Sequence, residues 1–170
     1  MAKRMRRPVE RGEYEDPDER LETLGRAAEQ DQHEDAMERS LCEDTVLALK
    51  TRPFRAVSPD ATVEKVVRAM SNLNIACIMV VDEGKLVGVF SDHDFLLRVY
   101  RNFAKLRKRP ISEVMTRNPA VAYDAALPAQ ALNQMSMGDF RHIPILDVDD
   151  KVVGILGPRR VIAYLTKFLS

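Results

Sequence analysis

Apolar residues divide the chain near residue 44 into a polar first part and a regularly patterned second part. Residues 1–16 show no periodicity, which is typical of a mobile segment. Asp16-Pro17 then has the composition of a helix start. Apolar residues follow thinly at helical spacing, at Leu21, Leu24, Ala28, Ala36, Met37 and Leu41. We expect a helix there that is ordered only against the main body or a partner, because so few apolar residues cannot stabilise it alone.

The second part of the chain contains one pattern twice. Val57–Val63 corresponds to Val121–Leu127, and Leu86–Phe90 corresponds to Val152–Leu156. Each copy has the periodicity of a short strand, a helix with an apolar stripe, two apolar strands joined by a polar turn, and a closing helix. The middle strands are expected at Ile75–Val81 and His142–Leu146, and the closing helices at Phe95–Phe103 and from Val161 onward. The duplication predicts a strand-helix-strand-strand-helix unit that occurs twice.

Ser91 and Asp94 lie where the last strand of the first copy runs into its closing helix. Backbone N–H groups at such a helix start can bind an anion, and the Ser91 hydroxyl can add a contact. The Asp94 carboxylate can accept hydrogen bonds from the two neighbouring hydroxyls of a ribose. The pair therefore indicates a nucleotide site. The same Ser-x-x-Asp spacing is also that of a capping box, which satisfies the helix start without any ligand.

Three stretches carry a resemblance to a known family. Gly88–Asp94 resembles the Gly-h-h-Ser/Thr-x-x-Asp motif of CBS domains, Val114–Pro119 resembles the opening of a CBS repeat, and Arg141–Ile145 resembles its second strand. Taken in order and with the duplication, the chain resembles a free-standing tandem pair of CBS domains, also called a Bateman module. The resemblance implies an α/β fold of two repeats packed with pseudo-twofold symmetry. It also implies one cleft per repeat, which in many relatives binds adenosine compounds.

We divide the chain accordingly into three parts. Residues 1–43 are expected to form a charged N-terminal extension that is partly helical. Residues 44–107 are expected to form the first CBS repeat, and residues 108–170 the second.

The resemblance assigns ligand roles in the first cleft. Asp94 is the candidate ribose ligand, and Ser91 is the candidate contact to phosphate or ribose. Arg141 and His142 precede Pro144 on the second strand of the second copy, where basic residues meet ligand phosphates in several relatives. The implied regulatory ligand is AMP, ADP, ATP or a related adenosine compound, and no other cofactor is expected.

The second copy departs from this pattern. Gly157 and Arg160 stand at the positions of the motif serine and aspartate. Arginine has no acceptor for a ribose, so we expect one nucleoside site per chain. Two hypotheses remain for Arg160. It contacts the phosphates of the ligand held by Asp94, or it forms a surface ion pair with Asp92 or Asp139.

Composition narrows the class of protein. The chain has 170 residues, of which 45% are hydrophobic and 31% charged, and its longest apolar runs have strand length, so no membrane span is expected. Cys42 and Cys77 form no CxxC motif, and His33-Glu34-Asp35 would point in different directions on a helix, so no metal site is expected. No apolar stretch follows the basic residues Lys3–Arg7, so the cytoplasm is the expected location.

Charge is balanced in total but unevenly distributed. The formal net charge is zero, although residues 1–44 contain 8 basic and 14 acidic residues. The connector Arg98–Arg109 contains six basic residues and no acidic one. We expect it to be a solvated helix end, with pairing to the acidic N-terminal segment or contact with nucleic acid as alternatives. The balanced total charge and the lack of interleaved base-stacking aromatic residues count against nucleic-acid binding.

The sequence contains no nucleophile elbow, P-loop or dinucleotide-binding fingerprint, so an enzyme is not expected. The leading hypothesis is a regulatory or sensor module, in which an adenosine-type ligand near Ser91 and Asp94 shifts a conformational or oligomeric equilibrium. The alternative is a ligand-free dimerisation or partner-interaction module, and accessory nucleic-acid binding is the least favoured hypothesis. The resemblance also implies a homodimer, and the apolar stripes expected at its interface are Leu96, Val99 and Phe103, and Val161, Leu165 and Phe168.

Overall fold

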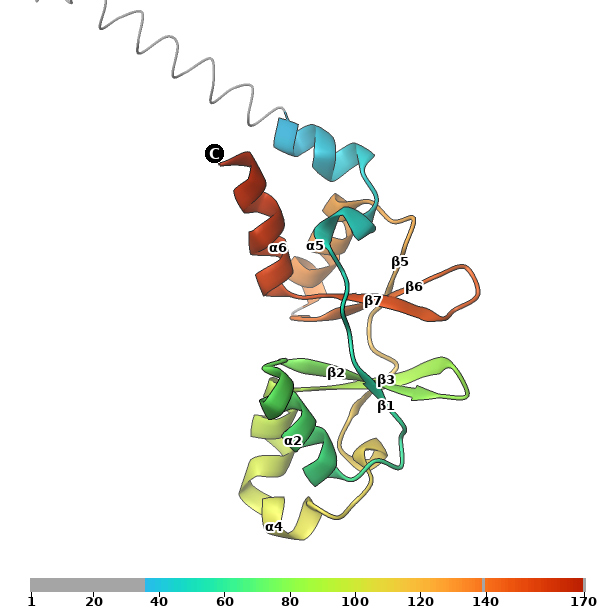
Figure 1. Ribbon diagram of the computed structural model, residues 1–170, viewed down its shortest axis with the longest axis vertical. Helices are drawn as coiled ribbons and strands as arrows, with labels where there is room; N and C mark the ends of the chain where they lie inside the picture. The colour runs from blue at the N-terminus through green and yellow to red at the C-terminus, as the bar shows by residue number, and fades with distance from the viewer. Residues whose placement is uncertain (1–35, 139, 170) are drawn as a thin grey trace, which may run out of the picture.

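The computed structural model describes residues 36–138 and 140–169, which form two α/β units stacked one on the other (Figure 1). The first unit consists of β1 (Ala56–Val57), α2 (Val63–Leu73), β2 (Cys77–Asp82), β3 (Lys85–Ser91) and a closing helical segment. The second unit consists of β5 (Ala122–Tyr123), α5 (Pro128–Gly138), β6 (Ile143–Leu146), β7 (Val152–Leu156), α6 (Pro158–Leu165) and the 3-10 turn η5 (Thr166–Phe168). The predicted order of elements is confirmed in both copies.

Each unit contains one small mixed sheet. The first sheet has the strand order β1-β2-β3-β4, in which β1 is parallel to β2 and the other neighbours are antiparallel. Its fourth strand, β4 (Thr116–Arg117), comes from the segment that leads into the second unit. The second sheet has the order β5-β6-β7 with the same strand directions. The hairpins β2-β3 and β6-β7 extend to the same side of the molecule, and an isolated bridge between Lys85 and Lys151 joins them (Figure 1).

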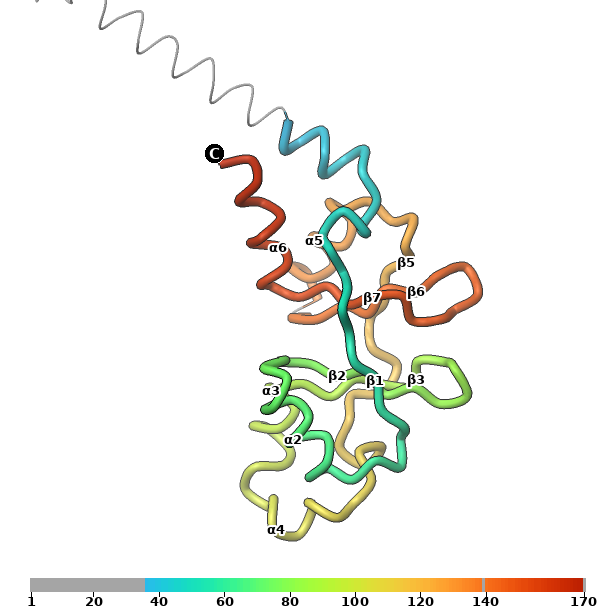
Figure 2. Tube along the Cα trace, viewed as in Figure 1, coloured from blue at the N-terminus to red at the C-terminus, as the bar shows by residue number. Residues whose placement is uncertain are grey.

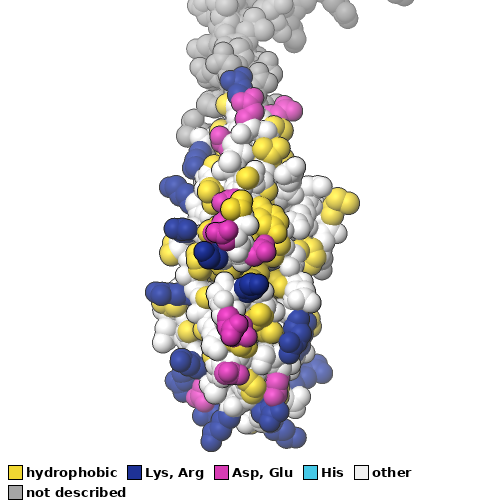
Figure 3. All heavy atoms as spheres, turned by 90° about the vertical axis from the view of Figure 1, so that its right-hand side faces the viewer, with side chains coloured by type: hydrophobic (Ala, Val, Ile, Leu, Met, Phe, Trp, Pro, Cys, Tyr) yellow, Lys and Arg dark blue, Asp and Glu magenta, His cyan; other side chains and the backbone are white. Residues whose placement is uncertain are grey.

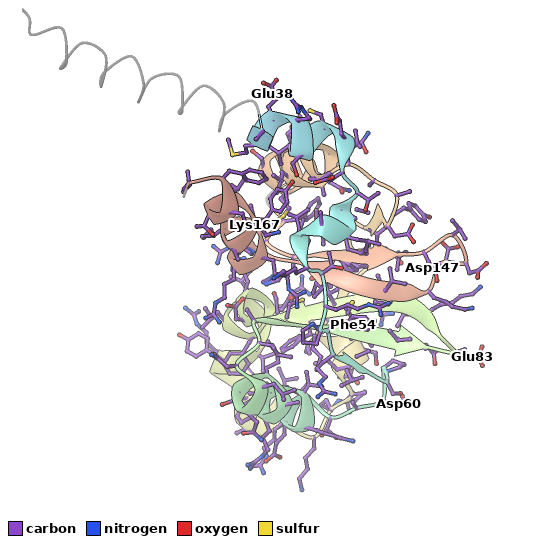
Figure 4. All side chains as sticks on the ribbon, turned by 45° about the horizontal axis from the view of Figure 1, so that its top comes forward. Glu38, Phe54, Asp60, Glu83, Asp147 and Lys167 are labelled. Atoms are coloured by element: carbon purple, nitrogen blue, oxygen red, sulfur yellow. The ribbon has the colours of Figure 1, made fainter. Side chains whose placement is uncertain are left out.

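The two sheets face each other, with helices on the outer side of each (Figure 1). In the first core, Val63 and Val66 of α2 are fully buried beside Phe90 of β3, as their helical spacing predicts. The second core is built around Ala131, Ile143, Ile145, Leu156 and Tyr164. A third cluster lies between the sheets and is made of Cys77, Met79, Val89 and Ile155. Phe54 packs against this cluster, and Figure 4 shows it between the two sheets.

The chain passes between the two units twice, and one short helical turn precedes each passage (Figure 2). The turn η1 (Val46–Leu49) packs into the core of the second unit, although it precedes β1 of the first. The turn η4 (Ile111–Glu113) does the reverse, since Ile111 is fully buried in the core of the first unit. The segment before each passage therefore packs into the core of the unit that the chain is leaving, and this packing ties the two units together.

The closing segment of the first unit differs from the single regular helix expected at Phe95–Phe103. It consists of α3 (Asp92–Asp94), the π-helical turn η2 (Phe95–Val99), the 3-10 turn η3 (Tyr100–Asn102) and α4 (Phe103–Leu106). The Tyr100 N–H donates to the Phe95 carbonyl, which adds a residue to that turn. Phe95, Val99 and Phe103 consequently face the core, whereas Leu96 and Tyr100 are 59% and 53% exposed.

The burial of these residues bears on the apolar stripes expected at a dimer interface, which stay a prediction. Val99 is fully buried in the chain's own core, and Phe103 packs against the same core. The second expected stripe packs against the core of the second unit through all three of its members, Val161, Leu165 and Phe168. Of the six residues, Leu96 is the one left exposed.

The N-terminal extension is described from residue 36 onward. Residues 36–43 are helical, and Leu41 packs against the second core. The hydroxyls of Ser40 and Tyr164 lie 2.5 Å apart and fasten this helix to α6. The helix start at Asp16, the basic residues Lys3–Arg7 and the triplet His33-Glu34-Asp35 lie outside the described residues. Among the helices of the described part, none is both long enough and apolar enough to span a bilayer.

Candidate functional site

Two clefts lie between the units, and each is built from elements of both repeats. The first is a cavity of about 230 Å³, lined by Ser91–Asp94 at the end of β3, by Asn118–Ala120 after β4 and by Phe140–His142 before β6. The second is a cavity of about 540 Å³, lined by the corresponding segments of the opposite repeats, Gly157–Arg160, Pro53–Arg55 and Asn74–Ala76. In each cleft, the strand-to-helix junction of one repeat therefore faces the segments that precede the strands of the other repeat.

Ser91 and Asp94 form a capping box at the start of α3. The Asp94 N–H donates to Ser91 Oγ at 3.2 Å, and the Ser91 N–H donates to Asp94 Oδ2 at 2.9 Å. The Ser91 hydroxyl also donates to Asp94 Oδ2, at 2.7 Å. The capping interpretation of the Ser-x-x-Asp spacing is therefore confirmed, and a ligand role for the pair stays a prediction.

Thr116 and Arg98 complete the surroundings of the Asp94 carboxylate. Thr116 Oγ1 donates to Asp94 Oδ1 at 2.8 Å, and Arg98 Nη1 lies 3.3 Å from the same oxygen. Asp94 is 6% exposed. A carboxylate has about four acceptor sites, so both oxygens of Asp94 are satisfied within the protein. Any hydroxyl of a ligand that binds Asp94 has to replace one of these donors.

Neither of these two partners of Asp94 was predicted from the sequence. Arg98 stands four residues after Asp94, a spacing that favours ion pairs on helices and could have identified it. Thr116 is separated from Asp94 by 22 residues, and no local pattern signals the contact. Its position within Val114–Pro119, the stretch that resembles the opening of a repeat, is the only sequence feature that singles it out.

Arg141 and His142 lie in the same cleft as Asp94, as expected for residues that would meet its ligand. Both also line the second cleft, so they form part of the wall between the two. Burial lowers the pKa of His142, and Arg141 acts in the same direction, whereas Asp92 opposes them. Pro144 lies buried in β6 opposite Ile155 and is not among the lining residues of either cleft.

Gly157 and Arg160 form a different arrangement at the start of α6. A Cβ atom on Gly157 would lie 2.8 Å from Cδ2 of His142, so the imidazole occupies the space that a serine side chain would need. Arg160 donates to the backbone carbonyls of Lys50 and Pro53, and burial lowers its pKa. It therefore contacts backbone rather than Asp92, and it lines the second cleft rather than the cleft of Asp94. Asp139 lies outside the described residues.

The basic connector is tied to its own unit in three places. Besides the contact of Arg98 with Asp94, Arg107 pairs with Glu64 at 2.9 Å and Arg109 pairs with Glu113 at 2.6 Å. All six basic residues of the connector are nevertheless exposed, in agreement with the expected solvated helix end. Figure 3 shows Lys and Arg side chains gathered over this end of the first unit.

Cys77 of β2 is a further titratable group that lines both clefts. Burial raises the pKa of Cys77 to about 12, and Asp94 and Asp92 contribute to the same shift, so its thiol stays protonated at neutral pH. Within residues 36–138 and 140–169, no three His, Cys, Asp or Glu side chains lie close enough together to hold a metal ion.

A family model described as the CBS domain matches this chain twice, over residues 46–101 and 111–167. The chain is 31% identical over 111 residues to the CBS domain-containing protein YhcV of Bacillus subtilis, which covers 62% of this chain and 74% of YhcV. It is 27% identical over 115 residues to CBSCBSPB1 of Arabidopsis thaliana, which covers 67% of this chain and 21% of that protein. The chain thus spans about a fifth of the length of the plant relatives that it matches.

Solved structures of CBS proteins have the same fold. The crystal structure of the CBS domain NE2398 is 29% identical, with a TM-score of 0.63, and the match covers 73% of this chain and 95% of that one. CBSX2 in complex with AMP is 23% identical with a TM-score of 0.62, covering 72% and 98%. The CBS domain pair of MJ0100, in complex with 5′-methylthioadenosine and S-adenosylmethionine, is 24% identical with a TM-score of 0.61, covering 72% and 98%. The predicted fold of two such repeats is confirmed.

Replacing Thr116 by valine removes the hydroxyl that donates to Asp94 and keeps the shape of the side chain. We expect the free energy of unfolding, measured in urea, to fall by about 1–3 kcal/mol because a buried carboxylate loses a donor. The control is Thr166→Val, which removes an exposed hydroxyl at the end of α6 and should change stability by less than about 0.5 kcal/mol. Equal losses in the two variants would contradict this role of Thr116.

Stability should also depend on the protonation of His142. Because burial depresses its pKa below the ordinary value of 6.5, the unfolded chain binds the proton more readily, and stability is lost as the pH falls below about 6.5. The slope that one proton can contribute is at most about 1.4 kcal/mol per pH unit. Denaturation of the wild type and of His142→Asn at pH 7.5, 6.5 and 5.5 measures this loss. An unchanged pH dependence in the variant would show that another group is responsible.

Proposed function

The chain belongs to the CBS domain family, and we propose that it is a regulatory module whose first cleft binds an adenosine-type ligand beside Ser91 and Asp94. The observation that carries the proposal is the buried Asp94 carboxylate, which borders a cleft that also contains Arg141 and His142. A carboxylate suits a ribose diol, and cationic or protonatable groups suit phosphates. AMP in CBSX2, and 5′-methylthioadenosine and S-adenosylmethionine in the MJ0100 pair, support this class of ligand.

Ligand binding at Asp94 takes the form of an exchange of hydroxyl groups. The carboxylate accepts from the hydroxyls of Ser91 and Thr116, and the two hydroxyls of a ribose would replace these donors one for one. The ion pair with Arg98 and the N–H of Ser91 can remain in place. Since donors are replaced rather than lost, the buried charge stays compensated throughout.

The same exchange provides a route for a signal. Thr116 belongs to β4, at the crossing into the second unit, and the ribose would release it from Asp94. Regulation requires that the ligand bind the states with and without the contact from Thr116 to Asp94 with different affinity, and replacement of this contact by a ribose hydroxyl supplies such a difference.

On the phosphate side, Arg141 offers an exposed guanidinium and His142 a neutral imidazole. A bound phosphate would favour the protonated form of His142, so ligands with more phosphates should gain most at mildly acidic pH. We propose a regulatory rather than a catalytic role in the cytoplasm, with AMP, ADP, ATP or a sulfonium adenosine compound as the candidate ligands.

Homodimer formation is a second proposal, because the irregular closing segment of the first unit leaves apolar side chains exposed. Leu96, Leu97 and Tyr100 are 59%, 68% and 53% exposed, and Ile162 of α6 is 62% exposed. Of these exposed residues, Leu96 was also in a stripe expected from the sequence, whereas Leu97, Tyr100 and Ile162 were not. In a twofold dimer these helices would pack against their copies. A dimer that forms without any ligand would correspond to the alternative function, a dimerisation or partner-interaction module.

The ligand proposal is tested by thermal unfolding of the wild type with AMP, ADP, ATP and S-adenosylmethionine in turn. A ligand at a hundred times its dissociation constant should add about 2.7 kcal/mol, a shift of a few degrees. The shift should disappear in Asp94→Asn, whose amide cannot accept from both hydroxyls, and persist in Asp60→Asn, which changes an exposed carboxylate outside both clefts. No shift with any ligand, or an equal shift in Asp94→Asn, would refute the proposal.

The dimer proposal is tested by light scattering at tens of micromolar protein. The wild type should have the mass of two chains, and Leu97→Glu should give single chains because a charge on that surface opposes apolar packing. Val148→Glu, at a position 87% exposed in the β6-β7 turn, should remain dimeric. A monomeric wild type would remove the proposal.

A further inference from the structure

The closing segment of the first unit carries an outer basic surface, formed by Arg101, Lys105 and Lys108. Phe103 and Leu106 of this segment pack against the first core, and the three basic side chains, four and three residues apart in sequence, are exposed on its other side. Among the described residues, no carboxylate lies within 4.0 Å of any of the three cations. Like charges at this spacing on a helix repel each other, so an anionic partner would stabilise the segment.

The neighbouring arginines of the connector have partners that fix its position. Arg107 Nη2 lies 2.9 Å from Glu64 Oε2, and Arg109 Nη2 lies 2.6 Å from Glu113 Oε1. The Glu64 N–H also donates to the Arg107 carbonyl at 2.9 Å. The Val63 N–H donates to the Arg109 carbonyl at 3.0 Å. The connector is therefore fastened to the start of α2, and the outer basic surface is the part of it that has no counter-charge among the described residues.

A stretch of opposite charge lies in the chain outside the described residues. Residues 10–22 contain seven acidic and two basic residues, and no other stretch of 13 residues in the chain contains as many acidic ones. Its formal charge, two positive minus seven negative, is −5, against +3 for the outer basic surface. Such charges attract each other over roughly 10 Å at an ionic strength of about 0.1 M.

We propose that the acidic stretch of residues 10–22 binds the outer basic surface of the same chain. Figure 1 shows residues 36–43 and α4 at opposite ends of the molecule, so the stretch has to run along both units. Residues 10–35 span at most about 90 Å when extended, and a compact domain of this size has a radius of gyration of about 14 Å. The segment is therefore long enough to reach the far end of the first unit.

Attachment to the same chain makes weak ion pairs sufficient. An exposed ion pair contributes little by itself, but several pairs form here at once, and the chain holds the acidic stretch near its binding surface. Binding should therefore be favoured at low ionic strength and lost at high ionic strength. The proposal does not rest on ligand binding, because Arg101, Lys105 and Lys108 line neither cleft.

The test is cross-linking of the full chain with a carbodiimide, which joins a lysine amine to a carboxylate in direct contact, followed by mass spectrometry of the linked peptides. We expect links from Lys105 and Lys108 to carboxylates of residues 10–22 at low ionic strength. They should be lost in about 1 M NaCl, where the Debye length is about 3 Å. Lys85 is the control lysine, because it is exposed at the start of β3, in the other part of the first unit.

Two variants test the contribution of charge. Arg101→Gln should lower the yield of the links from Lys105 and Lys108 about threefold, because it removes one cation of the surface and no amine. Arg159→Gln is the matched control, since it removes an exposed arginine of α6 in the second unit and should leave the yield unchanged.

A mixture of isotopically labelled and unlabelled chains distinguishes links within one chain from links between two. Links between labelled and unlabelled chains would assign this surface to the acidic stretch of a second copy and overturn the proposal. It would also be overturned by the absence of links from Lys105 and Lys108, by equal yields at Lys85, or by unchanged yields in high salt or in Arg101→Gln.

Discussion

A buried carboxylate needs its charge compensated, and at Asp94 this requirement joins three parts of the chain. The cap of α3 supplies Ser91, the helical segment that follows supplies Arg98, and the crossing into the second unit supplies Thr116 through β4. Removing any donor leaves part of a buried charge unsatisfied, so the Asp94 side chain holds the three segments in their relative positions. The first cleft owes its shape to this arrangement, because Ser91, Asp94 and Thr116 all line it.

The duplicated fold is nearly symmetric, but its chemistry is not. Asp94 accepts hydrogen bonds from the incoming segment of the second unit, whereas Arg160 at the corresponding position donates to carbonyls of the segment at Lys50 and Pro53. Both side chains bind a strand-to-helix junction to a segment that passes between the units, Asp94 as a hydrogen-bond acceptor and Arg160 as a donor. The same scaffold therefore presents a carboxylate at this position in one cleft and a guanidinium at the corresponding position in the other.

Local spacing was sufficient to predict the regular elements. Val63, Val66 and Met70 are buried because a helix that packs on a sheet buries every third or fourth residue, and that period is visible in the sequence. The π turn at Phe95–Val99 could not be predicted in this way, since Phe95, Leu96 and Leu97 are all apolar and offer several possible stripes. The contact from Thr116 to Asp94 depends on how the crossing packs, which no local pattern records. The spacing of Ser91 and Asp94 predicted both a helix cap and a ligand site. The hydrogen bonds between the two residues confirm the cap, and the ligand site stays a prediction.

The central claim is that an adenosine ligand takes the place of Thr116 at Asp94, and a crystal structure of the full chain grown with AMP tests it most directly. We expect ribose hydroxyls within hydrogen-bond distance of both Asp94 oxygens, and a distance from Thr116 Oγ1 to Asp94 Oδ1 longer than the present 2.8 Å. AMP bound elsewhere, or bound in the first cleft with the contact from Thr116 to Asp94 intact, would contradict it.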